Sequence, residues 1–405
     1  MRGRFIGIDA GGTMTKAALF DETGTELACA RKPNTMLFPA PGHTERDPDR
    51  MWQAACAAIR AVLDESGTDP ADVLAVATTG YGSGLYLVDD ELRPVRPGIV
   101  STDSRAAALV AGWEADGTAT ACAPLVQQRF WAGQAAPLLA WLAREEPEVI
   151  ARTRSVLWCK DFLRARLCGE ISTDPTDAGI AGLIDVTTGQ YATDLFAPIG
   201  MGAWADKLPP IGPSSEVCGT VTPEAARLCG LRAGTPVVRG VVDVAAASLA
   251  SGMADPSTLT VVAGTFSINQ TLHATPRTST WPFLQCAYPV GNSFLATEGA
   301  PTSAGNLEWF CRVMLDAEAE RAAARGKTIY EVCEHLVGDA LSRRSDILFF
   351  PFLFGGGPRN APAGIVGLTA SGSLSDVVGA IYEGIAFAHR LDIDRLLSGP
   401  DAAAP

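Results

Sequence analysis

The sequence predicts an α/β protein made of two duplicated domains, and three observations lead to this expectation. The chain has 405 residues, which is more than one hydrophobic core usually accommodates. Apolar β-type runs alternate with helical stretches throughout, as is typical of α/β folds. Two segments, "GIDAGGTMTKAAL" near the start and "TVVAGTFSINQTL" near residue 260, share a plan of strand, glycine-containing tip and strand. We therefore expect one domain over residues 1–244 and a second over 245–405.

The first half of the chain carries clear strand and helix patterns. Strands are expected at residues 5–8, 17–20, 26–30 and 73–80, where apolar runs lie between turn residues. Residues 48–66 are expected to be helical, because apolar side chains recur on one face and Pro48 lies near the start. Two more helices are predicted in "QAAPLLAWLAREEPEVIA" and in "KDFLRARLCG", the second ending at Gly169.

The second half repeats this alternation. "GTPVVRGVVDVAAASLASG" is expected to run from a strand into an alanine-rich helix, and residues 257–272 form a predicted hairpin. "DILFFPFLFGGGPRN" predicts an apolar strand that opens onto a glycine-rich loop. "SDVVGAIYEGIAFAHRLDIDRLL" predicts a long helix with Ser375 or Ser373 as its N-cap.

Charge and composition exclude several kinds of partner. A formal net charge of −13 argues against binding to a nucleic-acid backbone or to an anionic membrane. No apolar run reaches the length that spans a bilayer. The ten cysteines contain no CxxC pair, which indicates thiols in a reducing compartment. We expect a soluble cytoplasmic protein that acts on a small molecule.

The tip of the first predicted hairpin combines residue types that suit a phosphate group. Glycines let backbone N–H groups approach an anion closely, and threonine hydroxyls add further donors. A carboxylate contacts a phosphate favourably only through a metal ion such as Mg²⁺, and a lysine offsets charge or pairs locally. A plain hairpin turn is the alternative. The residues concerned are Asp9, Gly11, Gly12, Thr13, Thr15 and Lys16.

A second tip, at Gly264 and Thr265, repeats the small-residue pattern and predicts contact with another phosphate of the same nucleotide. The loop "APTSAGNLEWF", which contains Gly305, leads into a predicted helix whose N-terminus favours anions. The alternatives are a simple β-turn at the tip and a helix start capped by Thr302 or Ser303.

Asp243 is the most informative acidic residue, because it lies in an apolar segment where a strand changes to a helix. A buried carboxylate is costly unless it is paired, hydrogen-bonded or functional. It is interpreted here as a general base that takes a proton from a substrate hydroxyl. A helix N-cap is the alternative.

These segments together resemble the FGGY family of carbohydrate kinases, and the resemblance covers nearly the whole chain. The quoted hairpins, "RPGIVSTDSRA", "KDFLRARLCGEISTDPTDAG", the Asp243 segment and "YEGIAFA" each resemble a family motif. The resemblance implies two ribonuclease-H-like domains, as in actin and hexokinase, with an active-site cleft between them. It also implies ATP and Mg²⁺ as cofactors.

Within the family, the chain is most similar to L-xylulose kinases, on "TERDPDRMWQ" and "EGAPTSAGNLEWF" among other segments. This implies phosphorylation of a ketopentose such as L-xylulose or D-xylulose. D-xylulose kinases usually carry Met-His-Gly where this chain has Gly82-Ser83-Gly84, so the sugar stays open. Ribulose, erythritol and glycerol are alternatives.

The resemblance also implies roles for single residues. Asp243 would be the catalytic base and a substrate contact, and Asp9 would act through Mg²⁺. Ser83, Asp103 and Trp131 would contact the sugar. Asp103 with Arg105 is equally explained as a structural ion pair, and Trp131 as part of the core.

One departure concerns the end of the sequence. Family members continue into a strand and a glycine-rich loop that packs on adenine, whereas this sequence stops at "LLSGPDAAAP". We therefore expect an incomplete second domain without the adenosine loop. A catalytically inactive sugar-binding regulator and an actin-like ATPase are the rival functions, and a homodimer is left open.

Overall fold

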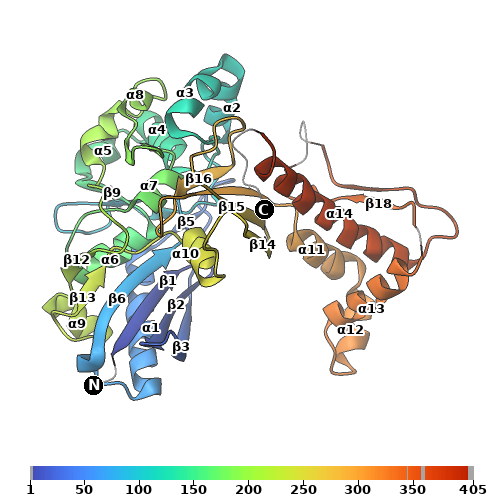
Figure 1. Ribbon diagram of the computed structural model, residues 1–405, viewed down its shortest axis with the longest axis horizontal. Coiled ribbons are helices and arrows are strands. Elements are labelled where there is room, and N and C mark those ends of the chain that lie inside the picture. The colour runs from blue at the N-terminus through green and yellow to red at the C-terminus, as the bar shows by residue number, and fades with distance from the viewer. Residues whose placement is uncertain (1–2, 344, 357–360, 400–405) are drawn as a thin grey trace. The chain divides into compact units, whose positions relative to one another are not determined.

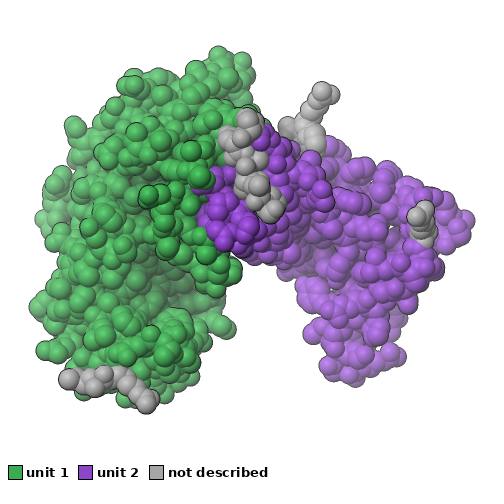
Figure 2. Space-filling model, viewed as in Figure 1, with its two compact units in different colours: residues 1–254, 274–295 green, residues 255–273, 296–405 purple. Residues whose placement is uncertain are grey.

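Figure 1 shows the fold of the chain in a computed structural model, which describes residues 3–343, 345–356 and 361–399. The chain divides into two compact units, coloured separately in Figure 2. Unit 1 comprises residues 1–254 and 274–295, and unit 2 comprises residues 255–273 and 296–405. The domain boundary predicted at residue 244 stays a prediction.

A six-stranded sheet with the order β12-β13-β6-β1-β2-β3 forms the centre of unit 1. The first three strands, which the sequence predicted, pair antiparallel with one another in order, while β6 runs parallel to both β1 and β13. Side chains of β1 and β2 alternate between buried and partly exposed positions, which places one face of the sheet against a core. The strands are β1 Arg4–Ala10, β2 Met14–Asp21, β3 Glu26–Pro33, β6 Val73–Gly80, β12 Val217–Thr220 and β13 Pro236–Val238.

Three helices pack together with this sheet: α1 (Pro48–Ser66), α6 (Cys159–Cys168) and α9 (Pro223–Cys229). The bounds predicted for α1 are confirmed, because Asp47 caps its first amides and Gly67 ends it in the left-handed conformation. The predicted end of α6 at Gly169 is confirmed in the same way. Their apolar faces and the sheet share one hydrophobic core.

A second core in unit 1 is formed mainly by short helices. The single helix predicted over residues 134–151 is wrong: α4 ends at Glu145 and α5 begins at Glu148, because Pro147 cannot continue the hydrogen-bond ladder. The remaining helices of unit 1, including α10, which lies outside this core, are α2 Ala107–Asp116, α3 Thr118–Val126, α4 Ala135–Glu145, α5 Glu148–Arg152, α7 Pro175–Ile180, α8 Thr193–Phe196 and α10 Asp243–Ala250, with 3-10 turns at Pro70–Asp72 and Gly202–Lys207.

Short strands complete unit 1. They are β4 Met36–Leu37, β5 Glu45–Arg46, β7 Tyr86–Val88, β8 Gly98–Ile99, β9 Ser155–Leu157, β10 Ile184–Asp185, β11 Gln190–Tyr191 and β16 Leu284–Ala287. Of these, β5 leads directly into α1, so that its Arg46 side chain lies beneath the tip between β1 and β2.

A buried cluster of charged side chains connects α6 with α7. Lys160 Nζ lies 2.6 Å from Asp161 Oδ1 and 2.8 Å from Asp174 Oδ1, and Arg164 Nη1 lies 2.8 Å from Asp161 Oδ1. Burial and the neighbouring carboxylates raise the pKa of Asp177 well above its usual range, although Lys160 opposes this. Two cations therefore face three acidic side chains, and the raised pKa of Asp177 reduces the negative charge that these side chains carry together.

Unit 2 contains the second predicted hairpin, in which β14 (Leu259–Ala263) pairs antiparallel with β15 (Ser267–His273). Ser373 caps the long helix α14 and forms a capping box with Asp376. Of the two N-cap residues predicted, Ser373 and Ser375, the structure therefore shows Ser373. Residues 357–360 of the predicted glycine-rich loop lie outside the described residues. The other elements are β17 Phe294–Ala300, α11 Ala304–Met314, α12 Asp316–Ala323, α13 Ile329–Leu341, β18 Leu348–Phe350, β19 Gly364–Val366 and α14 Leu374–Leu396.

In the part of the chain that the structure describes, no helix combines the length and the apolar character needed to cross a bilayer.

We expect Gly240→Ala to destabilise the protein by about 2 kcal/mol or more. Gly240 has a φ of 81°, and a β-carbon there would overlap the carbonyl oxygen of Thr78 on β6. Gly112→Ala is the matched control, because Gly112 lies within α2 with open space where a β-carbon would be. Thermal and urea unfolding of both variants measure the difference. Equal stability of the two variants would contradict the predicted close approach.

Candidate active site

The tip between β1 and β2 is held by hydrogen bonds to its carbonyl oxygens. Asn34 Nδ2 donates to Gly11 O at 3.0 Å, and the Asn34 amide donates to Thr13 O at 2.8 Å. Arg46 Nη2 donates to Gly11 O at 3.0 Å and also to Gly12 O. Within the described residues, no backbone carbonyl accepts from the amides of Gly11, Gly12 or Thr13. Three consecutive amide groups are therefore available to an anion.

The predicted tip residues have different surroundings. Asp9 and Lys16 face each other across the hairpin, with 3.2 Å between Lys16 Nζ and Asp9 Oδ2, and both remain partly exposed. Thr13 is exposed, whereas Thr15 is fully buried and donates from Oγ1 to Asn34 Oδ1 at 3.0 Å. Thr15 therefore supports the tip from inside, and Asp9, Lys16 and Thr13 are the side chains that a ligand can reach.

Asp243 reaches the same edge of the sheet through the segment that follows β13. The Thr79 hydroxyl, at the end of β6, donates to Val241 O at 2.8 Å. The Val242 amide donates to Thr176 Oγ1 at 2.9 Å. Asp243 is then the first residue of α10, and Val242 occupies the N-cap position without a side-chain cap bond. The N-cap alternative for Asp243 is therefore not what the structure shows.

The electrostatic surroundings of Asp243 connect it with the tip of the first hairpin. Burial raises the pKa of Asp243 to about 6, and the charge of Asp9 adds to this effect. A hydrogen bond from the Val244 amide and the charge of Lys16 act in the opposite direction. The structure thus brings Asp9, Lys16 and Asp243 together.

The predicted sugar-binding segment Gly82-Ser83-Gly84 packs beside Val242, the neighbour of Asp243. A β-carbon at Gly82 would lie 2.8 Å from the Val242 side chain and 2.9 Å from that of Ile180. Ser83 is fully buried, has an unusual positive φ of 63°, and donates from Oγ to Ile180 O at 3.2 Å. The Ser83 hydroxyl oxygen keeps its capacity to accept a hydrogen bond.

Trp131 lies in the loop next to this segment, since the Gly84 amide donates to Gly133 O at 3.3 Å. Its ring contacts Phe283, with 5.4 Å between ring centroids. Its indole Nε1 is buried and has no hydrogen-bond partner within the described residues. An unpartnered donor of this kind is costly unless a ligand or water accepts from it.

Asp103 is already fully engaged with protein groups. Its oxygens accept from the Thr44 amide at 2.6 Å, from the Arg105 amide at 2.8 Å, and from Arg105 Nε and Nη2 at 2.9 Å. Arg105 also pairs with Glu45, at 2.8 Å. This geometry favours the structural ion pair that the sequence left as an alternative, and a sugar contact of Asp103 stays a prediction.

In unit 2, the structure brings the predicted tip and the predicted helix start together. The Ala304 amide donates to Gly264 O at 2.9 Å. A β-carbon at Gly305 would lie 3.2 Å from Thr265, so the N-terminus of α11 packs directly against the tip. Ser303 occupies the N-cap position of α11 but makes no side-chain cap bond. The Asn306 amide also has an acceptor, Ser303 O at 2.9 Å, so that within the described residues the Gly305 amide stays available to an anion in this first turn.

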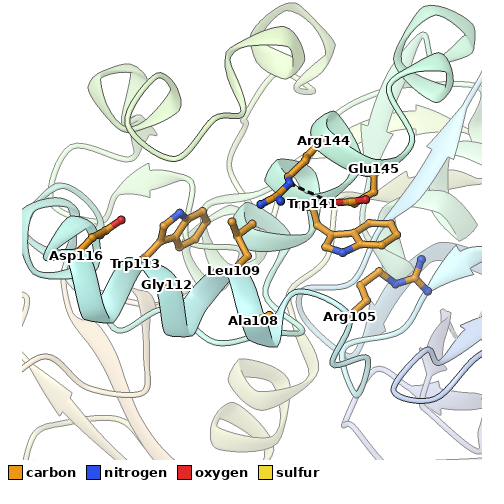
Figure 3. Close-up of a pocket in the computed structure, with 9 residues that line it drawn as sticks. All are labelled: Arg105, Ala108, Leu109, Gly112, Trp113, Asp116, Trp141, Arg144 and Glu145. Atoms are coloured by element: carbon orange, nitrogen blue, oxygen red, sulfur yellow. Dashed lines mark ion pairs between the residues drawn. The ribbon is translucent and has the colours of Figure 1, made fainter.

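A surface hollow of about 390 Å³ lies elsewhere in unit 1, along α2 and the end of α4. Figure 3 shows Leu109 between the two tryptophans Trp113 and Trp141, with Arg105 beside Trp141. None of its lining residues belongs to the predicted site, although Arg105 pairs with Asp103. We do not assign the candidate active site to this hollow.

Sequence reasoning missed three residues that shape the site: Asn34, Arg46 and Thr176. Asn34 lies just after β3, and nothing in its surroundings marks it as a partner of the tip. Arg46 lies in "TERDPDRMWQ", one of the segments that resemble L-xylulose kinases. A charged residue in such a segment is usually exposed, so its burial was not expected.

Comparisons with known proteins agree with this geometry. The N-terminal domain pattern of the FGGY family of carbohydrate kinases matches residues 4–250. The chain is 35% identical over 97% of its length to a probable L-xylulose kinase from Pasteurella multocida, and it covers 79% of that protein. It is 33% identical to the L-xylulose/3-keto-L-gulonate kinase of Escherichia coli, over 97% of this chain and 77% of that protein.

Solved structures give the same result. A xylulose kinase from Rhodospirillum rubrum superimposes with a TM-score of 0.85 and 26% identity, over 96% of this chain and 78% of the other. A gluconate kinase from Lactobacillus acidophilus, at 20% identity and a TM-score of 0.88, shares the fold over all of this chain and 80% of its own. The fold is thus the actin/hexokinase-like fold predicted. The chain belongs to the FGGY family of carbohydrate kinases.

Proposed function

We propose that this carbohydrate kinase transfers the γ-phosphoryl group of ATP to a hydroxyl group of a ketopentose, with L-xylulose as the first candidate. The observation that carries the proposal is the convergence of Asp9, Lys16 and Asp243 at one edge of the sheet, beside three available amides. L-xylulose is preferred because the names of the relatives from Pasteurella multocida and Escherichia coli include it.

Asp243 would be the general base. A base must be largely deprotonated near neutral pH and still hold a proton well enough to take one from a hydroxyl group. A pKa of about 6 meets both conditions better than the usual value of a carboxyl group. Its position beside the 82–84 segment would place a bound sugar hydroxyl within its reach.

The first hairpin would hold the phosphates. The amides of Gly11, Gly12 and Thr13 would donate to phosphate oxygens, with Lys16 offsetting their charge. Asp9 fits a Mg²⁺ site, because its carboxylate is partly exposed beside these amides and oxygen ligands suit this ion. Bound Mg²⁺ would neutralise charge on the phosphates. The sugar would lie against Ser83 and Trp131.

Several parts of the proposal rest on sequence resemblance. Gly264, Thr265 and Gly305 stay predicted phosphate contacts, supported by the uncapped start of α11. The homodimer and the cytoplasmic location also stay predictions. An inactive sugar-binding regulator is the alternative that the activity test below separates from the kinase.

We expect the 405-residue chain to release ADP from Mg·ATP when a ketopentose is added, and Asp243→Asn to lower this turnover by roughly 100- to 10,000-fold. The asparagine keeps the shape of the side chain but cannot accept the proton. A coupled ADP assay with L-xylulose, D-xylulose, ribulose, erythritol and glycerol measures both expectations. Near-wild-type turnover of the variant would remove Asp243 from the mechanism, and sugar binding without ADP release would favour the regulator.

We also expect Asp243→Asn to raise the melting temperature at pH 8. Since the pKa of Asp243 is raised on folding, its charge destabilises the folded protein above pH 6, and this cost disappears as the pH falls toward 4. Asp174→Asn is the control, for which we expect the opposite change, a lower melting temperature. Burial alone would raise the pKa of Asp174, but Lys160 and hydroxyl donors outweigh it and lower the pKa, so losing this charge should destabilise. Scanning fluorimetry from pH 4 to 8 measures the melting temperatures of both variants. A melting temperature of Asp243→Asn below that of the wild type at pH 8 would refute the destabilisation assigned to the Asp243 charge.

Asp9→Asn is expected to weaken the use of Mg·ATP much more than the binding of sugar, because the amide removes the charge that Mg²⁺ requires. Asp21→Asn is the matched control, since Asp21 ends β2 at the other end of the same hairpin and is far along the strand from the tip. Calorimetry with each ligand alone gives the two affinities. Equal losses for both ligands in Asp9→Asn would indicate a folding role instead.

A further inference from the structure

Arg46 is a fully buried arginine without a carboxylate partner. Its side chain is 1% exposed and makes contacts with the tip, with Met51 Sδ at 3.2 Å, and with the ring of Tyr81 at 5.3 Å from the centroid. Among the described residues, no carboxylate lies within ion-pair distance of its guanidinium group. Other buried cations of unit 1, such as Lys160 and Arg105, each have carboxylate partners.

The polar groups around Arg46 do not supply a negative charge either. Tyr81 and Tyr86 share a hydrogen bond of 2.5 Å, and Cys159 lies in the same pocket of residues. Burial raises the pKa of all three groups above their usual values, so they are neutral at physiological pH. The positive charge of Arg46 therefore has no ion-pair partner among the described residues, which is a costly arrangement for a buried ion.

The position of this charge indicates what compensates it. Arg46 Nη2 donates to the carbonyl oxygens of Gly11 and Gly12, so the guanidinium group lies directly beneath the tip whose amides are available on the other side. Donation to a carbonyl oxygen also polarises the peptide group, which strengthens the N–H on its far side as a donor. An anion bound to these amides would thus interact with a fixed backbone. It would also interact with the buried positive charge of Arg46, which lies on the opposite side of the same peptide groups.

We propose that Arg46 is a positioning residue for phosphoryl transfer, whose buried charge fixes the Gly11–Gly12 carbonyls and makes the tip selective for a polyphosphate. This inference rests on the proposed function, because it assigns the available amides of the tip to the phosphates of the nucleotide. Arg46 acts through the backbone and does not touch the substrate. Its guanidinium donates two hydrogen bonds from a planar group, which a lysine cannot reproduce.

The test uses inorganic tripolyphosphate with Mg²⁺ as the probe, and the whole 405-residue chain. Arg46→Gln removes the charge but keeps an amide donor, and we expect it to weaken tripolyphosphate binding in calorimetry by roughly tenfold or more. Arg46→Lys keeps the charge and should recover part of this loss. In the kinase assay, Arg46→Gln should raise the KM for Mg·ATP with little change in the KM for the sugar.

Arg60→Gln is the matched control. Arg60 also donates to two consecutive carbonyl oxygens, those of Arg227 and Leu228, but it is exposed and lies on α1 away from the tip. It should leave tripolyphosphate binding unchanged. If Arg46→Gln does not fold, Arg46→Met and Arg46→Lys carry the same comparison. A folded Arg46 variant without the charge that binds tripolyphosphate as tightly as Arg60→Gln overturns the inference.

The two proposals fail in different ways. If the wild-type chain phosphorylates a ketopentose while Arg46→Gln binds tripolyphosphate normally, the role of Arg46 is refuted and the proposed function stands. If the wild-type chain releases no ADP with any sugar but loses tripolyphosphate binding in Arg46→Gln, the proposed function fails and the role of Arg46 is supported.

Discussion

The parallel pairing of β6 with β1 on one side and with β13 on the other is the interaction on which the site depends. This register places Asp9 opposite Thr79 and brings the end of β13 to the same edge of the sheet. Because parallel strands all end at one edge, two segments more than 200 residues apart deliver their carboxylates to one place. The turn at Gly240 and the bond from Thr79 to Val241 then direct the chain into α10.

Sequence patterns predicted the elements of the sheet well, because their signals are local. Helix α1 has a proline at its first position and a glycine after its last, and both bounds follow from these residues. The break at Pro147 is also a local signal, although the prediction of one helix over residues 134–151 does not include it. The charged contacts of the site were only partly predictable. The pair of Asp103 with Arg105 is local in sequence, whereas the burial of Arg46 and the bond from the Thr44 amide to Asp103 arise from segments distant in sequence. Sequence gives the residue types of a site, whereas folding decides which of them already have partners.

Several groups of the candidate site have incomplete partners. Asp243 carries a carboxylate with a raised pKa, and among the described residues Arg46 has no counter-ion and the buried indole of Trp131 has no acceptor. The buried cluster around Lys160 also contains atoms without hydrogen-bond partners among the described residues, such as both carboxyl oxygens of Asp177, but its two cations pair with carboxylates and hold α6 to α7. Unsatisfied groups cost stability, and they become favourable where a ligand completes them.

The tight packing of the 82–84 segment restricts how this enzyme can change during evolution. A side chain at Gly82 would collide with Val242 and Ile180, and Gly84 has a φ of 70° and lies close to the carbonyl oxygen of Ile99. A larger residue at Gly82 would therefore press on Val242, the residue next to Asp243, and a larger residue at Gly84 would press on the backbone at Ile99. A lineage that substituted Gly82 would therefore pass through variants in which Val242, at the start of α10, is displaced. Substitution of Trp131 is less restricted, because its side chain is only partly buried.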